Sequence, residues 1–133
     1  MSAERATYLD SSAIVKLAIA EPESAGLRRY LRRRQPLVSS ALARTEVARA
    51  LLPLGEPAVR RGQEVLARLE LIRVSDRILV AAGALLPVGL RSLDAIHLAT
   101  VRHLGRDLAR LVTYDERMRE AAQAAGCPVA APR

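Results

Sequence analysis

The chain has 133 residues, half of them hydrophobic, which suits one compact domain with its own core, spanning residues 1–133. Its net charge of +7 suits a polyanionic partner such as nucleic acid, or an acidic protein, although a GC-rich coding sequence also explains its excess of Arg over Lys. The absence of Phe and Trp argues against recognition of nucleic acid by base stacking, and the single cysteine excludes an intramolecular disulfide and a cysteine-based metal site.

The amino-terminal stretch Met1-Ser2-Ala3-Glu4-Arg5 lacks the charged-then-apolar order of a signal peptide. No apolar run in the chain approaches the roughly 20 residues that cross a bilayer as a helix. The only cysteine, Cys127, fits a reducing compartment. We therefore expect a cytoplasmic protein without a membrane partner.

The first predicted strand covers residues 6–9 and ends directly before Asp10. Ser11 or Ser12 is predicted to cap the helix that follows, residues 13–20. Asp10 therefore falls in a strand-to-helix turn. Lys16, farther along this helix, is a candidate contact for phosphate, with an exposed helix lysine as the alternative.

A second helix is predicted to begin at Glu23 or Ser24 and to carry a run of arginines. Some of these arginines are one helical turn apart, so they share a basic face. This face is either a solvated surface or a contact for RNA or a protein partner. The arginines concerned are Arg28, Arg29, Arg32, Arg33 and Arg34, of which the first four are candidate RNA contacts.

Glu46 lies in an otherwise apolar helix, residues 41–52, which Ser40 is predicted to cap after a strand over residues 36–39. We place Glu46 in the second turn, at the border of the buried side. A buried carboxylate needs a partner or a metal, because leaving it uncompensated costs several kcal/mol. The alternative is a surface pair with Arg49.

The rest of the chain alternates predicted helices and strands. Strands alternating with helices in a short chain indicate an α/β fold, here a three-layer α/β/α domain with a short, mostly parallel sheet. The remaining predicted elements are a helix over 58–69, a strand over 71–74, a helix over 76–86 capped by Ser75, a helix over 93–104 capped by Ser92, a strand over 111–113, a helix over 115–125 and a strand over 128–130.

Two further acids fall at comparable junctions. Asp94 lies in the first turn of a helix, where the helix dipole favours its ionised form, although acids are common in first turns. Asp115 follows a strand directly, as Asp10 does. Because functional groups of an open parallel sheet collect at the carboxyl ends of its strands, we expect Asp10, Glu46, Asp94 and Asp115 to form one anionic pocket.

Ligands of this kind select a particular metal and chemistry. Carboxylate oxygens without cysteine favour a hard cation such as Mg²⁺ or Mn²⁺. One or two such ions can activate water and neutralise charge on a phosphate. The two histidines, His97 and His103, are poorly placed to add ligands, and we interpret them as packing or surface residues.

Four motifs in order carry a resemblance to a known family. They are Tyr8-Leu9-Asp10-Ser11-Ser12-Ala13, Glu46 in the helix after Val38-Ser39-Ser40, Leu93-Asp94-Ala95 and Val112-Thr113-Tyr114-Asp115. Together they resemble the PIN-domain ribonucleases, specifically the VapC toxins of type II toxin–antitoxin systems. The resemblance implies an Mg²⁺- or Mn²⁺-dependent endoribonuclease that cuts RNA of the translation machinery, forms a homodimer and is neutralised by a cognate antitoxin.

The resemblance also implies roles for individual residues. Asp10, Glu46, Asp94 and Asp115 match the acidic metal-binding and catalytic positions, with Asp10 and Asp94 as direct ligands and the other two acting through water or a second ion. Ser11 and Thr113 match hydroxyl positions that order the site. Some relatives place one more acid near the last motif, where Glu116 stands here and is expected to point elsewhere.

Two other functions compete with this one. An aspartate-based phosphotransferase would use Asp10 as its phosphate acceptor, but the dehalogenase-like pattern needs a second Asp where Ser12 stands. A non-catalytic RNA- or protein-binding module of the same fold is the other alternative. The four intact acids argue against it.

Overall fold

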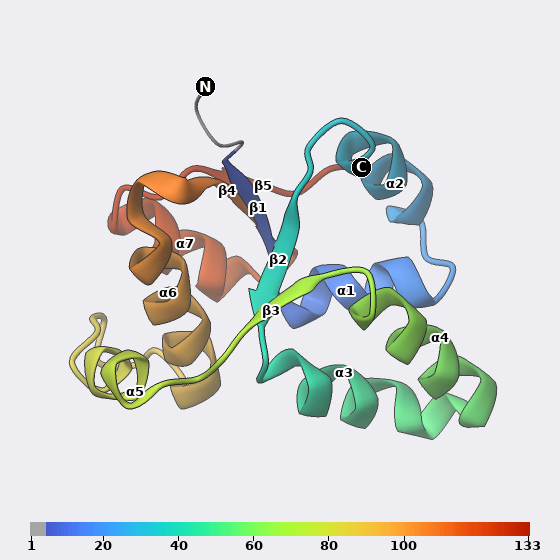
Figure 1. Ribbon diagram of the computed structural model, residues 1–133, viewed down its shortest axis with the longest axis horizontal. Coiled ribbons are helices and arrows are strands. Elements are labelled where there is room, and N and C mark those ends of the chain that lie inside the picture. The colour runs from blue at the N-terminus through green and yellow to red at the C-terminus, as the bar shows by residue number, and fades with distance from the viewer. Residues whose placement is uncertain (1–4) are drawn as a thin grey trace.

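A computed structural model describes residues 5–133 (Figure 1). Its five strands form one sheet in the order β3-β2-β1-β4-β5, and every neighbouring pair is parallel. The α/β fold with a parallel sheet is therefore confirmed. The strands are β1 (Ala6–Leu9), β2 (Leu37–Ser40), β3 (Glu70–Ile72), β4 (Leu108–Val112) and β5 (Val129–Ala130).

Helices cover both faces of this sheet, which confirms the three-layer arrangement (Figure 1). Helices α1 to α4 pack over one face, α6 and α7 cover the other, and α5 packs against α6. The helices are α1 (Ser11–Ala18), α2 (Ser24–Leu31), α3 (Ala43–Leu51), α4 (Glu56–Leu66), α5 (Asp76–Gly83), α6 (Ser92–Leu104) and α7 (Glu116–Ala124), with short 3₁₀ turns at Leu52–Leu54 and Gly105–Asp107.

The expectation of no signal peptide rests mainly on residues 1–4, which lie outside the described part of the chain. From residue 5 onward, every helix is too short or too polar to cross a membrane.

Alternating side chains of the central strands supply the two cores. Leu9 and Val112 face α1 to α4, while their neighbours Tyr8 and Leu111 face α6 and α7. All four side chains are fully buried. Full burial of a Leu or Val side chain stabilises a fold by about 1.5–3 kcal/mol. The two central strands are thus fixed from both faces, and so are the residues that follow them.

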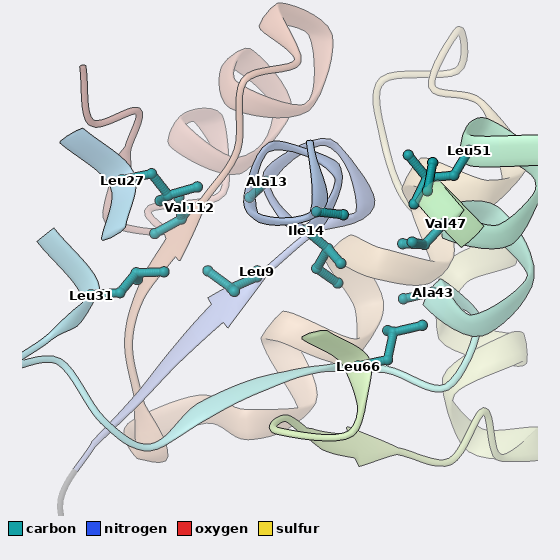
Figure 2. Packing of buried hydrophobic residues seen from close by; sticks show 12 residues of the cluster. Leu9, Ala13, Ile14, Leu27, Leu31, Ala43, Val47, Leu51, Leu66 and Val112 are labelled. Atoms are coloured by element: carbon teal, nitrogen blue, oxygen red, sulfur yellow. The ribbon is translucent and has the colours of Figure 1, made fainter. Parts of the chain in front are cut away.

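Helix α1 lies directly over β1 because its buried face begins immediately after the strand. Ile14 packs beside Leu9, with Leu27 of α2 and Leu51 of α3 on either side (Figure 2). A short turn therefore carries the chain from the sheet into the helix layer. Asp10 occupies this turn.

The ends of β1 and β4 lie level with each other. Leu9 pairs with Val112, and the Asp10 N–H donates to the Val112 carbonyl at 3.3 Å. Ser39 of β2 donates its hydroxyl to the Leu9 carbonyl at 2.6 Å. Asp10 and Thr113 consequently leave adjacent strands at the carboxyl edge of the sheet, as predicted for strand-end residues.

Two predicted helix caps are wrong. Asp10 itself caps α1, its Oδ1 accepting from the Ala13 N–H at 3.1 Å, because its backbone is extended and Ser11 is already helical. Ser92 is the first residue of α6, and the preceding Arg91 supplies no side-chain cap. Ser75 caps α5 as predicted, accepting from the Ile78 N–H at 3.3 Å.

Other boundaries shift by a few residues. Helix α2 ends at Leu31, so Arg32, Arg33 and Arg34 lie beyond it and do not share a helix face with Arg28 and Arg29. The predicted basic helix face is therefore shorter than the sequence indicated.

The start of α3 and the end of β4 also differ from the prediction. Ser40 accepts from the Leu42 N–H at 3.1 Å, but α3 begins only at Ala43, which puts Glu46 in its first turn rather than its second. Strand β4 ends at Val112, so Thr113 lies just outside it.

Candidate functional site

Asp10 is held rigidly in the turn between β1 and α1. Its side chain is buried, with Oδ1 accepting from the Ser12 hydroxyl at 2.6 Å and from the Ala13 N–H at 3.1 Å. Oδ2 accepts from the Thr113 hydroxyl. Burial raises the pKa of this carboxyl, although these hydrogen bonds act in the opposite direction. Ser12 and Thr113 therefore fix the orientation of an acid whose charge burial disfavours.

Glu46 reaches the same edge of the sheet from α3. Its Oε1 accepts from the Ser11 hydroxyl at 2.6 Å and lies 2.5 Å from His97 Nε2. Burial acts to raise the pKa of Glu46, but the hydrogen bonds from His97 and Ser11 and the charge of His97 outweigh it and lower the pKa. Arg49 is exposed, and the contacts of Glu46 across residues 5–133 are with Ser11 and His97 in place of the alternative surface pair.

His97 joins the site to the core, in contrast to its interpretation as a packing or surface residue. Its ring is 2% exposed, and Nδ1 lies 2.7 Å from the Tyr8 hydroxyl, with the two rings edge to face. Its other nitrogen contacts Glu46. These contacts connect Tyr8, His97, Glu46 and Ser11 in one series. One feature of the sequence could have indicated that His97 belongs to the site. It lies three residues after Asp94 on the same helix, about one turn away.

Asp94 lies half-buried in the first turn of α6, as predicted. Burial raises the pKa of its carboxyl, and the negative charges of Asp115, Asp10 and Glu46 raise it further, while His97 acts in the opposite direction. The other three predicted acids therefore lie within electrostatic reach of Asp94. Negative charge concentrates at this edge of an otherwise basic protein.

Asp115 caps α7 after the end of β4. Its Oδ1 accepts from the N–H groups of Arg117 at 2.9 Å and Met118 at 3.2 Å. Its own N–H donates to the Thr113 hydroxyl at 3.1 Å. The next acid, Glu116, is exposed and pairs with Arg119.

The oxygen atoms of the four acids are the ligand type that a hard divalent cation prefers, although the four side chains do not converge on one point in this structure. Across residues 5–133, no three Asp, Glu, His or Cys side chains stand at the spacing of a metal-binding cluster. The oxygens of Asp10 and Oε1 of Glu46 are occupied by hydroxyl, amide or imidazole partners. However, all four acids offer the oxygen ligands that such a cation prefers. The negative charges of the other three acids raise the pKa of Asp94, and a bound cation would offset this repulsion.

Lys16 lies close to these acids but is not a free surface lysine. Its ammonium contacts Glu23 at 2.7 Å and Glu21 at 3.5 Å, and it sits 4.9 Å from the centre of the Tyr114 ring. The side chain is 15% exposed. Lys16 lines a shallow hollow of about 460 Å³ together with Ser11, Ser12, Glu46 and Tyr114. It is thus ion-paired at the border of the acidic centre.

Removing the charge of Asp94 is expected to stabilise the metal-free protein. Because the pKa of Asp94 is raised by folding, the folded state binds this proton more tightly, and stability falls as pH rises through the window above the unfolded pKa. At neutral pH, Asp94→Asn should therefore raise the melting temperature, measured by circular dichroism in chelator.

Asp76 provides the matched control for this measurement. It is an exposed acid in the first turn of α5, where Asp76→Asn loses a favourable interaction with the helix dipole of about 0.3–1 kcal/mol and should lower the melting temperature slightly. Equal shifts of the same sign in both variants would mean that repulsion among the acids is not what destabilises the site.

Comparison with known proteins agrees with this fold. The PIN-domain family profile matches residues 7–124. The chain is 65% identical over 127 residues to ribonuclease VapC46 of Mycobacterium tuberculosis, covering 96% of this chain and 98% of the relative.

Two solved structures share the fold at low sequence identity. The M. tuberculosis sarcin-ricin loop cleaving toxin VapC20 has a TM-score of 0.74 at 16% identity, covering 91% of this chain and 95% of the other. A toxin–antitoxin complex from Klebsiella pneumoniae has a TM-score of 0.69 at 22% identity, covering 96% and 98%. The profile match and the identity to VapC46 together show that this chain belongs to the PIN-domain family, among its VapC ribonucleases.

Proposed function

We propose that this chain is an Mg²⁺- or Mn²⁺-dependent endoribonuclease toxin that hydrolyses phosphodiester bonds in RNA of the translation machinery. The observation that carries the proposal is the collection of Asp10, Glu46, Asp94 and Asp115 at one edge of the sheet in a protein of net charge +7. Carboxylates there can hold metal while arginines elsewhere attract the RNA backbone. The ribonuclease name of the relative at 65% identity supports the same activity.

Each acid has a distinct role in this proposal. Asp10 and Asp94 would hold the ion directly, while Glu46 and Asp115 would act through water or hold a second ion. A bound ion would supply activation of water and neutralisation of charge on the phosphate. The chain's own hydroxyls set the geometry, since Thr113 orients Asp10 and Ser11 orients Glu46. The contact of His97 with Glu46 lowers the pKa of Glu46 against the effect of burial.

The aspartate-based phosphotransferase is the weaker alternative. Asp10 is 5% exposed, and both of its oxygens already accept hydrogen bonds. The second Asp that the dehalogenase-like pattern needs is replaced by Ser12, which here donates its hydroxyl to Asp10. The ribonuclease name of the relative at 65% identity also argues against the non-catalytic binding module.

We further propose that residues 1–133 act as one cytoplasmic PIN domain that forms a homodimer and is restrained by a cognate antitoxin. A related fold occurs in a toxin–antitoxin complex. Apolar side chains are exposed at two places, which are candidate surfaces for these contacts. One is Leu52 and Leu54 after α3, and the other comprises Leu79, Val80, Leu86, Val88 and Leu93 around α5 and the start of α6.

Incubation of the purified chain with total cellular RNA tests the activity. With Mg²⁺ or Mn²⁺ we expect discrete fragments, because an endonuclease that recognises a structured target cuts at few positions. Mapping the fragment ends identifies the RNA and the cleavage site. The same reaction in excess chelator should leave the RNA intact, and cleavage that persists there would contradict the metal mechanism. RNA that is bound but never cut with metal present would favour the binding module.

A further inference from the structure

A second charged feature lies at the opposite edge of the sheet from the acids. Five arginine side chains line a hollow of about 630 Å³ where the chain enters the central strands, near the top of the sheet in Figure 1. We call this feature the arginine hollow. Its arginines are Arg5, Arg32, Arg33, Arg34 and Arg110.

Among residues 5–133, no carboxylate pairs with the arginines of this hollow. Its lining contains no Asp or Glu, and over residues 5–133 none of its arginines is ion-paired. Many other arginines of residues 5–133 also lack an ion pair, so what distinguishes the hollow is that five of them line one concave surface. Like charges gathered without counter-charges repel one another and destabilise the fold. Such an arrangement is favourable when an anion binds it.

Three of the guanidinium groups are fixed by neutral acceptors. Arg5 donates to the carbonyls of Arg106 at 3.2 Å and Leu108 at 2.6 Å. Arg110 donates to the Thr7 hydroxyl at 2.5 Å.

The third fixed group, Arg34, donates to the Tyr30 carbonyl at 2.7 Å and stacks on the Tyr30 ring at 3.8 Å. A guanidinium carries five N–H donors, so each of the three fixed groups keeps donors for a ligand. Arg32 and Arg33 are exposed beside them.

The ligand that best matches this chemistry is a chain of phosphates. Planar guanidinium groups bind phosphate oxygens in bidentate fashion, and several arginines side by side suit several phosphates. The one aromatic ring nearby, Tyr30, is already covered by Arg34, so bases gain no stacking platform there. The hollow therefore suits the sugar–phosphate backbone and not the bases.

We propose that the arginine hollow is a second RNA-binding site, which holds the backbone of the substrate at a distance from the acidic centre. This inference rests on the proposed ribonuclease function. Arg5 and Asp10 flank the two ends of β1 and are roughly 16 Å apart at about 3.3 Å per residue. An RNA that contacts both sites must extend from one end of the central strands to the other. A long or folded RNA can span this distance, whereas a short fragment cannot.

Binding of a labelled single-stranded oligouridine, measured by fluorescence anisotropy in chelator, tests the proposal without any cleavage. The test variant is Arg32→Glu with Arg33→Glu. The control is Arg60→Glu with Arg68→Glu, two exposed positions on and just after α4 that lower the net charge equally. We expect the test variant to weaken binding about tenfold more than the control and to reduce the salt slope by about 1.4 for two lost phosphate contacts.

The possible results distinguish binding by the arginine hollow from a general effect of net charge. Equal weakening by both double variants, or no weakening by either, overturns the proposal. If the test variant instead loses binding to polyglutamate and keeps oligouridine, the hollow binds an acidic protein, and the proposal is also overturned. Arg32→Gln with Arg33→Gln should give an intermediate loss, and equal melting temperatures show that the variants fold. Because no cleavage is measured, failure here leaves the nuclease assay to judge the proposed function separately.

Discussion

The variant Asp94→Asn is expected to cleave RNA about a thousandfold more slowly than the native chain, a loss of about 4 kcal/mol of transition-state stabilisation. The change removes a negative oxygen ligand and keeps nearly the same shape. Asp94 occupies the first turn of α6, and the melting temperature is expected to rise, so unfolding would not explain the loss. The measurement is the initial rate of fragment formation from the mapped RNA target at saturating Mg²⁺.

Asp76→Asn is the control, because it makes the same chemical change in the first turn of α5. It should cleave at the native rate. Asp10→Asn should lose activity to a similar extent, but it is the less clean test, since an amide replaces an oxygen that accepts from Ser12 or Thr113. Native rates in both Asp94→Asn and Asp10→Asn would show that the four acids are not the catalytic centre.

Removal of the His97 ring is expected to slow cleavage by about 10- to 100-fold, the usual cost of losing a group that orients a metal ligand. His97 does not reach the substrate in this proposal. It holds Glu46 through Nε2 at 2.5 Å and is itself held by Tyr8 at 2.7 Å. His97→Ala should therefore raise the Mg²⁺ concentration needed for half-maximal activity as well as lower the maximal rate, which cleavage at varied Mg²⁺ measures.

Two further variants separate positioning from packing. His103 is exposed on the same helix, so His103→Ala should leave both the rate and the Mg²⁺ requirement unchanged. His97→Gln retains an amide that can donate to Glu46, and it should recover part of the activity. If His97→Ala lowers the melting temperature but leaves the Mg²⁺ requirement of the folded fraction native, His97 is only a core residue.

The order of helices and strands along the chain was predictable because each element depends mainly on interactions between residues close in sequence. Alternating apolar runs and capping residues predicted the strands before Asp10 and Asp115 and the helix that begins near Asp94. The same pattern indicated a parallel sheet, and parallel strands bring their carboxyl ends to one edge. The sequence was therefore sufficient to place Asp10 and Asp115 together. The boundary error at Asp10 came from competition between Asp10 and the adjacent serines for one cap, whereas α6 begins at Ser92 itself and has no side-chain cap.

The partners of each side chain were decided only by the tertiary structure. Glu46 and His97 are 51 residues apart, and nothing in either local pattern brings them together. The helices that carry them, α3 and α6, pack on opposite faces of the sheet, yet the two side chains meet with their atoms 2.5 Å apart. The arginine hollow likewise collects Arg5, Arg33 and Arg110 from three segments. Periodicity fixes the face on which a residue lies, whereas contacts between distant segments depend on strand order and on how the helices pack.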